Sequence, residues 1–360
     1  MKKIIGLVLL LTVLLYSCKK DTSENFNLSK PLSVPVNGIS NPLGVTNQGT
    51  VTAYQTGTLL ANTTYTVVGN IVIPKGDTLF VQPGVHVCVE NGAAIMIQGA
   101  LVSIGTQQNP IWFTRCGRPK TDDVGQSQAT DSAWSGGSEN GIWVGIEGDT
   151  SCTLMVLKWT HIEFVGAGAN NASCTAFCDG IAIGATKTNY GIWFQTPRGH
   201  FIMEDSWEYG TQDDAIRVDK GNFDIMRNMF EKQGYVGGDC NNMKSGSVGD
   251  CAYNLYLGTA TNGSKASNKG SQPVECNMNI YNNTYINGGY RQTAGQKGAD
   301  INYEQGAEGY AYNNLIIDCK NGIRIVGSPI ADTAHMHYGN NYIYGDSTDL
   351  TTQFYPVGYI

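Results

Sequence analysis

The sequence has little charge and few long apolar runs. Asp, Glu, Lys and Arg make up 15% of its 360 residues, well below the ~25% of an average soluble protein. Beyond the N-terminal segment, no stretch reaches the ~18 apolar residues that a membrane-spanning helix needs. No helix-length stretch shows a capped 3.6-residue periodicity, apart from a turn or two at 224–232. These absences argue against a helical cytosolic enzyme and against a transmembrane span in the mature chain.

Basic residues and cofactor motifs are also scarce. The formal net charge is −7, and removal of Lys2 and Lys3 with a leader would bring it to −7 − 2 = −9. A nucleic-acid partner would require a basic face, so none is expected. The sequence has no P-loop, dinucleotide fingerprint or serine-hydrolase elbow. His335 and His337 lie two residues apart without an evident third ligand, so no metal site is predicted there.

The N-terminus has the features of an exported lipoprotein. Lys2 and Lys3 precede an apolar run over 4–15, which is typical of a signal peptide. Leu15-Tyr16-Ser17-Cys18 resembles a bacterial lipobox. The resemblance implies a signal peptide over 1–17, acylation of Cys18, and anchoring to the outer membrane in the cell envelope, on its surface or periplasmic face. The alternative is an ordinary secreted leader with an incidental cysteine.

The predicted domain organisation follows from this start. Residues 18–46 are polar and contain three prolines, which predicts a flexible tether. Residues 47–360 form the predicted folded domain, with 47–66 as an N-terminal cap. Ser-, Gly-, Asn- and Thr-rich insertions at 115–140, 169–180 and 259–275 are expected to be surface loops.

Nine cysteines remain when Cys18 is set aside, an odd number that cannot pair completely within one chain. Cys174 with Cys178, and Cys240 with Cys251, are candidate disulfides in an oxidising envelope. The other reading is that several cysteines are small buried apolar residues. It applies to Cys88, Cys152, Cys276 and Cys319.

Glycine and short β-type runs are abundant. The sequence has 45 Gly, and 19 of its residues are Tyr. Apolar runs of three to five residues recur between Gly, Pro and Asn, which indicates many short strands joined by tight turns. The N-terminal runs are 65–68, 71–73, 79–81, 85–89, 94–97, 101–104 and 111–113.

An asparagine repeat sets the period of these strands. Asn-Asn-x-x-apolar occurs at 282–286, 313–317 and 340–344, with spacings of 31 and 27 residues. Arg227-Asn228 lies about two periods earlier. A period of this length with three short strands per repeat is typical of a parallel β-helix, here of about 10–13 coils. One Asn per coil is then expected to point inward and form a hydrogen-bonded ladder.

Several motifs support this reading of the fold. The motif segments are 76–85, 94–101, 109–114, 141–146, 160–168 and 321–325. They resemble the right-handed parallel β-helix repeats of pectate lyases, polygalacturonases and many adhesins. They are similar above all to lipid-anchored β-helix proteins of the Bacteroidota, over about 65–345. The resemblance implies an all-β right-handed parallel β-helix, and it is weak for activity because this fold hosts many functions.

The candidate catalytic residues are Asp213, Asp214 and Arg217, in the most charged segment of the chain. Paired carboxylates with a nearby cation suit glycoside hydrolysis or uronate elimination. Gln212-Asp213-Asp214 resembles the paired-Asp motif of polygalacturonases, whose other motifs are absent. The segment that begins at Arg324 matches one of these other motifs only in part. The alternative is a turn in which Arg217 pairs with one aspartate.

The candidate substrate-binding residues are Trp207, Asp239, Lys244 and Arg291, which stacked coils would bring near the aspartate pair. A bound Ca²⁺ is a further option at Asp122, Asp123 and Asp131, although no calcium-loop motif is present. The favoured function is that of a lipid-anchored envelope protein that binds glycan or another extracellular partner. A lyase or hydrolase of acidic polysaccharide and an adhesive structural rod are the alternatives.

Overall fold

The computed structural model describes residues 43, 52–90, 92–116, 143–167, 189–234, 237–270, 272–290, 292, 297–325, 327 and 329–345. The chain divides into two compact units, 1–35 and 36–360, and all described residues belong to the second. They form 30 strands and no helix. Among them, no helix has the length and hydropathy that a membrane crossing requires. The helical turn predicted at 224–232 is wrong, because two strands occupy these residues.

The 30 strands form three parallel sheets of ten strands each. The first sheet contains β1 (Thr52–Tyr54), β4 (Asn70–Ile73), β7 (Ala94–Ile97), β10 (Gly145–Gly148), β13 (Ile192–Phe194), β16 (Ile216–Val218), β19 (Asn241–Met243), β22 (Ser264–Ser267), β25 (Ala299–Glu304) and β28 (Asn321–Ile325). The second sheet contains β2 (Gly57–Leu59), β5 (Thr78–Val81), β8 (Ala100–Ile104), β11 (Leu154–Lys158), β14 (His200–Glu204), β17 (Gly221–Met226), β20 (Ser247–Ala252), β23 (Asn277–Tyr281), β26 (Gly309–Tyr312) and β29 (Met336–Gly339). The third sheet contains β3 (Thr64–Val67), β6 (His86–Val89), β9 (Ile111–Arg115), β12 (Thr160–Glu163), β15 (Trp207–Tyr209), β18 (Met229–Glu231), β21 (Leu255–Leu257), β24 (Thr284–Ile286), β27 (Leu315–Ile317) and β30 (Tyr342–Tyr344).

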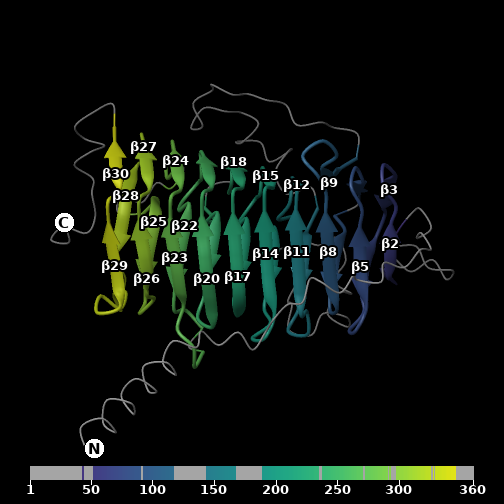
Figure 1. Cartoon of the computed structure of the whole chain (residues 1–360), viewed down its shortest axis with the longest axis horizontal. Helices are drawn as coiled ribbons and strands as arrows, with labels where there is room; N and C mark the ends of the chain where they lie inside the picture. The colour runs from purple at the N-terminus through teal and green to yellow at the C-terminus, as the bar shows by residue number, and fades with distance from the viewer. Residues whose placement is uncertain are drawn as a thin grey trace, which may run out of the picture. The chain divides into compact units, whose positions relative to one another are not determined.

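Each strand pairs in parallel with the strand three places later in the chain, so three consecutive strands make one coil. In Figure 1, the strands of the second sheet lie side by side in chain order, from β5, β8 and β11 onward. The structure is therefore a right-handed parallel β-helix of ten coils in the described residues. The predicted fold class is confirmed, and the coil number lies at the lower end of the predicted range.

Strand alternation divides each coil into an interior and an outer face. Ile192 and Phe194 of β13 belong to the continuous buried core, whereas Trp193 between them is half-buried. Aromatic rings stack from coil to coil inside, as in the series Phe230, Tyr256 and Tyr285, with centroid separations of 5.1 and 4.4 Å. The core thus runs the length of the coil stack, while outward side chains form columns on each sheet.

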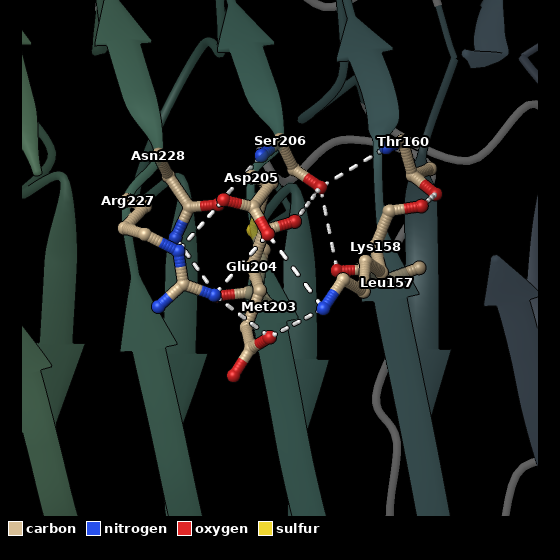
Figure 2. A network of polar contacts seen from close by, with 9 residues as sticks. All are labelled: Leu157, Lys158, Thr160, Met203, Glu204, Asp205, Ser206, Arg227 and Asn228. Carbon is tan, nitrogen blue, oxygen red and sulfur yellow. Dashed lines mark hydrogen bonds and ion pairs between the residues drawn. The ribbon is translucent and has the colours of Figure 1, made fainter. Parts of the chain in front are cut away.

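The predicted asparagine ladder is confirmed at the turn between the second and third sheets. The side-chain oxygen of Asn228 accepts a hydrogen bond from the Ser206 backbone N–H at 2.9 Å, and Asn228 donates to the Met203 carbonyl at 2.8 Å. Figure 2 shows Thr160, Ser206 and Asn228 aligned in successive coils. The ladder continues through Asn254, Asn283, Asn314 and Asn341. It begins with Ser103, Thr160 and Ser206, which the Asn repeat did not reveal.

The structure also explains why two asparagines adjoin in the repeat. The residue before each ladder position from Thr160 to Asn341 has a positive φ, 56° at both Asn282 and Asn313. Asn tolerates this left-handed conformation better than most residues. The first Asn of each pair therefore forms the turn, and the second forms the ladder.

Two boundary predictions are wrong. Residues 47–66 were expected to cap the stack, but β1, β2 and part of β3 lie there and belong to the first coil. The segment 259–275 was expected to be a loop, but it contains β22, which pairs with β19 and β25. The Ser-, Gly- and Asn-rich composition misled because it is typical of loops, whereas Ser264, Ala266 and Ser267 are buried residues of a strand.

The cysteines divide between the two predicted states. Cys88 forms a disulfide with Cys116, which corrects its assignment as a buried apolar residue. Cys240 and Cys251 are both free and buried, so the disulfide suggested for them is absent. Cys152, Cys276 and Cys319 are free and buried, as that reading expected. Cys174 and Cys178 lie outside the described residues.

Candidate functional site

The outer face of the first sheet turns polar over its later strands. Register places one outward residue of each strand in a single column, which we call the outer column. Its members are Trp193, Arg217, Asn242, Lys265, Asn302 and Arg324. Adjacent strands lie ~4.8 Å apart, so the six residues span about five strand spacings. The column offers an aromatic ring, two amides and three cations along the stacking direction.

A cavity of about 300 Å³ opens beside the C-terminal half of this column. Its lining consists of Gly238, Asp239, Thr261, Asn262, Lys265, Gln292, Lys297, Glu304 and Arg324. Three of these side chains are cationic and two are carboxylates. The cavity is therefore a mixed-charge polar pocket, of the kind that suits hydroxyl-rich or acidic ligands.

Asp239 is the centre of the polar network in this pocket. It accepts hydrogen bonds from Asn242 at 2.9 Å and from Asn262 at 2.5 Å, and it lies 3.3 Å from the Lys265 ammonium. Lys265 also pairs with Glu304 at 3.2 Å. Burial lowers the pKa of Lys265, but the charges of Asp239 and Glu304 outweigh this effect and raise it. The pocket therefore holds a permanently charged ammonium between two carboxylates.

Asp214 lies one coil earlier and supports Asp239. Its two oxygens accept from the Asp239 backbone N–H at 2.8 Å and from the Asn242 amide at 2.7 Å. Asp213 accepts from the Asp214 N–H at 3.0 Å. Burial, followed by the charges of Asp239 and Asp213, raises the pKa of Asp214 to about 7. Asp214 is thus a buried carboxyl that can hold a proton near neutral pH.

Lys244 and Arg217 flank the aspartates. Lys244 is buried, and its pKa is lowered by burial and by the charge of Lys265. Arg217 donates to Asp219 at 2.7 Å and to the Tyr190 hydroxyl at 2.6 Å, and its guanidinium lies 4.5 Å from the Tyr190 ring centroid. Its closest approach to Asp214 is 3.9 Å. The main partner of Arg217 is therefore Asp219, not the aspartate pair.

The structure brings most of the predicted site residues together. Asp213, Asp214, Arg217, Asp239 and Lys244 all lie at the first sheet between β13 and β22. Their proximity follows from the coil period, because Asp214 and Asp239 are 25 residues apart and take equivalent places in successive coils.

Trp207 does not belong to this group. It lies on the third sheet, where it packs edge-on against His161, with ring centroids 5.3 Å apart. His161 stacks in turn on Trp112 at 4.3 Å. This aromatic series lies on a different face from the outer column. Arg291 and the calcium candidates Asp122, Asp123 and Asp131 lie outside the described residues.

Sequence reasoning missed Asn242, Asn262 and Lys265 as pocket residues, although it had noted Lys297 and Glu304 in a polar stretch of the chain. One signal was available, because Asp214, Asp239 and Asn262 recur at 25 and 23 residues. Extending this period along the chain would have aligned the outer column. The unequal lengths of the turns obscured it, since the step from Asn262 to the next coil is 37 residues, to Ala299.

A second charged cluster lies at the turn after the second sheet. Arg227 pairs with Asp205 at 2.7 Å and Glu204 at 2.9 Å, and Lys158 pairs with Glu204 at 3.1 Å (Figure 2). All four side chains neutralise one another on the surface. Their charges are already paired with one another, and the cavity beside Asp239 does not include them, so this cluster is not the better candidate site.

No family model matches the chain, and no curated protein and no solved structure matches it either. The resemblance to lipid-anchored β-helix proteins and to pectate-lyase-like enzymes therefore stays an expectation based on sequence motifs.

Proposed function

We propose that the protein is an exported β-helix protein that binds an acidic glycan along the outer column and in the adjoining pocket. The observation that carries this proposal is the pocket beside Asp239, with Lys265, Lys297 and Arg324 around a cavity of about 300 Å³. Ammonium and guanidinium groups bind sugar carboxylates or sulfates through charge-assisted hydrogen bonds. The asparagine amides supply donors and acceptors for hydroxyl groups.

The aromatic end of the column supports an extended ligand. Trp193 donates to Asp219 at 2.8 Å, and Tyr190 packs edge-on against Trp193 with centroids 5.1 Å apart. Aromatic rings present an apolar surface beside polar groups, which suits the mixed character of a sugar ring. A chain lying along the coil axis would contact these rings at one end and Arg324 at the other.

Catalysis on the same glycan is the second candidate function. It is favoured by Asp214, whose pKa of about 7 would let it donate a proton at neutral pH, beside Asp239 and Lys244. A general acid and a base of matched pKa are what glycoside hydrolysis or uronate elimination requires. Against this function, both Asp214 oxygens already accept hydrogen bonds from the protein. Binding therefore remains the first proposal.

The test uses the mature chain with Cys18→Ser, titrated with acidic and neutral polysaccharides. We expect binding of an acidic polysaccharide that weakens with added salt and falls at least about tenfold in Arg324→Gln. Arg227→Gln is the matched control, because it removes the same charge from a surface ion-pair cluster away from the pocket. Retention of full affinity by Arg324→Gln, or equal losses in both variants, would contradict the proposal.

The same samples separate binding from catalysis. Reducing ends and ultraviolet-absorbing unsaturated uronates are followed during incubation with each polysaccharide. Product that disappears in Asp214→Asn would establish an enzyme, and the absorbing product would identify a lyase. Binding without product leaves a glycan-binding protein. Neither binding nor product on the whole panel would favour the adhesive structural rod.

A further inference from the structure

Three side chains with metal-ligating atoms converge near the last described coil, away from the outer column. They are Glu308, Asp332 and His335, whose ligand atoms all lie within 4.8 Å of one another. The His335 Nδ1 lies 2.7 Å from an Asp332 oxygen and 3.9 Å from a Glu308 oxygen. From the sequence, His335 had no third ligand in view, and the fold supplies two carboxylates.

The β-helix holds these residues in place through its backbone. Glu308 and His335 directly precede the paired residues Gly309 of β26 and Met336 of β29. The Asp332 N–H donates to the Ala307 carbonyl at 3.0 Å, and the Glu308 N–H donates to the Cys276 carbonyl at 2.9 Å. Ligands from two successive coils are therefore juxtaposed by strand register.

Each carboxylate uses one oxygen in the protein and directs the other toward the imidazole. Glu308 Oε1 accepts from the Asn277 amide at 2.8 Å, while Oε2 faces His335. Asp332 Oδ1 accepts from the Ala334 N–H at 3.0 Å, while Oδ2 contacts His335 Nδ1. Such supporting hydrogen bonds orient the ligands of protein metal sites.

We propose that Glu308, Asp332 and His335 bind one divalent transition-metal cation of the Zn²⁺ class. One imidazole nitrogen and two carboxylate oxygens match the ligands that Zn²⁺ accepts, and three protein ligands leave a position for water. The 69% exposed His335 and the partly exposed carboxylates leave the site open to solvent. Glu275 adds negative charge in the neighbourhood of His335.

The consequence of binding is structural, because the cation would join two successive coils, those of β26 and β29. Glu308 belongs to the coil of β26, and Asp332 and His335 belong to the segment that leads into β29. A solenoid coil contacts only its neighbouring coils and can open locally. The bound cation would therefore protect residues 329–345 from local opening.

The experiment measures Zn²⁺ binding to the mature Cys18→Ser chain by competition with a chromogenic chelator in a buffer that does not bind metal. We expect the wild-type sequence to bind one more Zn²⁺ than His335→Ala, or to bind it roughly tenfold or more tightly. Asp332→Asn should show the same loss. His337→Ala, two residues away on β29, is the matched control and should bind as the wild type does.

Hydrogen exchange gives a readout that does not depend on other zinc ligands in the chain. Added Zn²⁺ should slow exchange over 329–345 in the wild-type sequence and in His337→Ala, but not in His335→Ala. Equal Zn²⁺ binding by the wild type and His335→Ala would overturn the proposal. So would the absence of any Zn²⁺-dependent protection over 329–345, or equal losses in His335→Ala and His337→Ala.

Discussion

At the scale of single residues, the interior contains carboxyl groups whose pKa is raised by burial. Glu208 of β15 lies between Ile162 and Phe230 in register, and both neighbours belong to the core. Thr211 donates to its Oε1 at 3.0 Å, while Oε2 has no hydrogen-bond partner among the described residues. Burial raises the pKa of Glu208 to about 8. An ionised group there would lack the solvation that it has in water.

This environment predicts a pH dependence of stability. The unfolded chain releases the Glu208 proton near pH ~4.3, whereas the folded chain keeps it until about pH 8. The folded state therefore binds more protons in this window, and the free energy of unfolding decreases as pH rises through it. We expect Glu208→Gln to show a smaller decrease than the wild type between pH 5 and pH 8 in urea denaturation. Parallel curves for the two proteins would contradict this assignment.

At the scale of elements, the turn between the second and third sheets repeats almost unchanged from coil to coil. From the coil of Thr160 to the coil of Asn341, one residue with positive φ is followed by one ladder residue. Asn283 shows how a ladder side chain pairs backbone groups of the preceding coil. Its side-chain oxygen accepts a hydrogen bond from the Asn254 N–H, and its amide donates one to the Cys251 carbonyl, both at 2.9 Å. The ladder satisfies backbone groups that the sheets leave unpaired at the bend.

Removal of one ladder side chain should therefore destabilise the stack. We expect Asn283→Ala to lower the free energy of unfolding by about 1–3 kcal/mol, since buried backbone groups lose their partners. Asn282→Gly is the matched control and should change stability by less than about 0.5 kcal/mol, because Gly adopts the φ of 56° freely. Chemical denaturation monitored by circular dichroism measures both. Equal effects of the two substitutions would contradict the division of roles within the Asn pair.

At the scale of the whole molecule, the predicted export and lipid anchoring would place the proposed glycan site at the cell envelope. The signal peptide over 1–17 and the acylation of Cys18 rest on the lipobox-like sequence alone, because these residues lie outside the described ranges. A chain with several acyl groups would bind membranes stably. The β-helix, with its proposed glycan site, would then be held at the envelope through the predicted tether 18–46.

Anchoring predicts a covalent lipid on the mature protein. Cells expressing the full chain should incorporate a labelled fatty acid into it and retain it in the membrane fraction. Cys18→Ser should abolish labelling and release the protein from that fraction. Cys319→Ser, which alters a buried free cysteine of the β-helix, is the control and should keep the label. Labelling that persists in Cys18→Ser would contradict the predicted lipid site.

The β-helix could be predicted from the sequence because the patterns that indicate it are local and repeated. The short apolar runs between 65 and 113 coincide with strands β3 to β9, and the Asn pairs mark the ladder. A solenoid coil contacts mainly its neighbours, so a period in the chain translates directly into a contact in space. Asp214 was selected because it lies in a highly charged segment, and its contact with Asp239 follows the coil period of 25 residues.

The pocket and the cluster of Glu308, Asp332 and His335 could not be predicted from the coil period, because they depend on the lengths of the turns. Turns of unequal length bring Lys265 beside Glu304 and Glu308 beside His335. Trp207 was wrongly assigned to the site because it is close to the aspartates in sequence. The bend between β15 and β16 places it on the third sheet, whereas the aspartates lie at the first sheet. Repetition along the chain specifies which strands stack. Which side chains share a face depends on the register and on the length of every intervening turn, and these follow from packing in three dimensions.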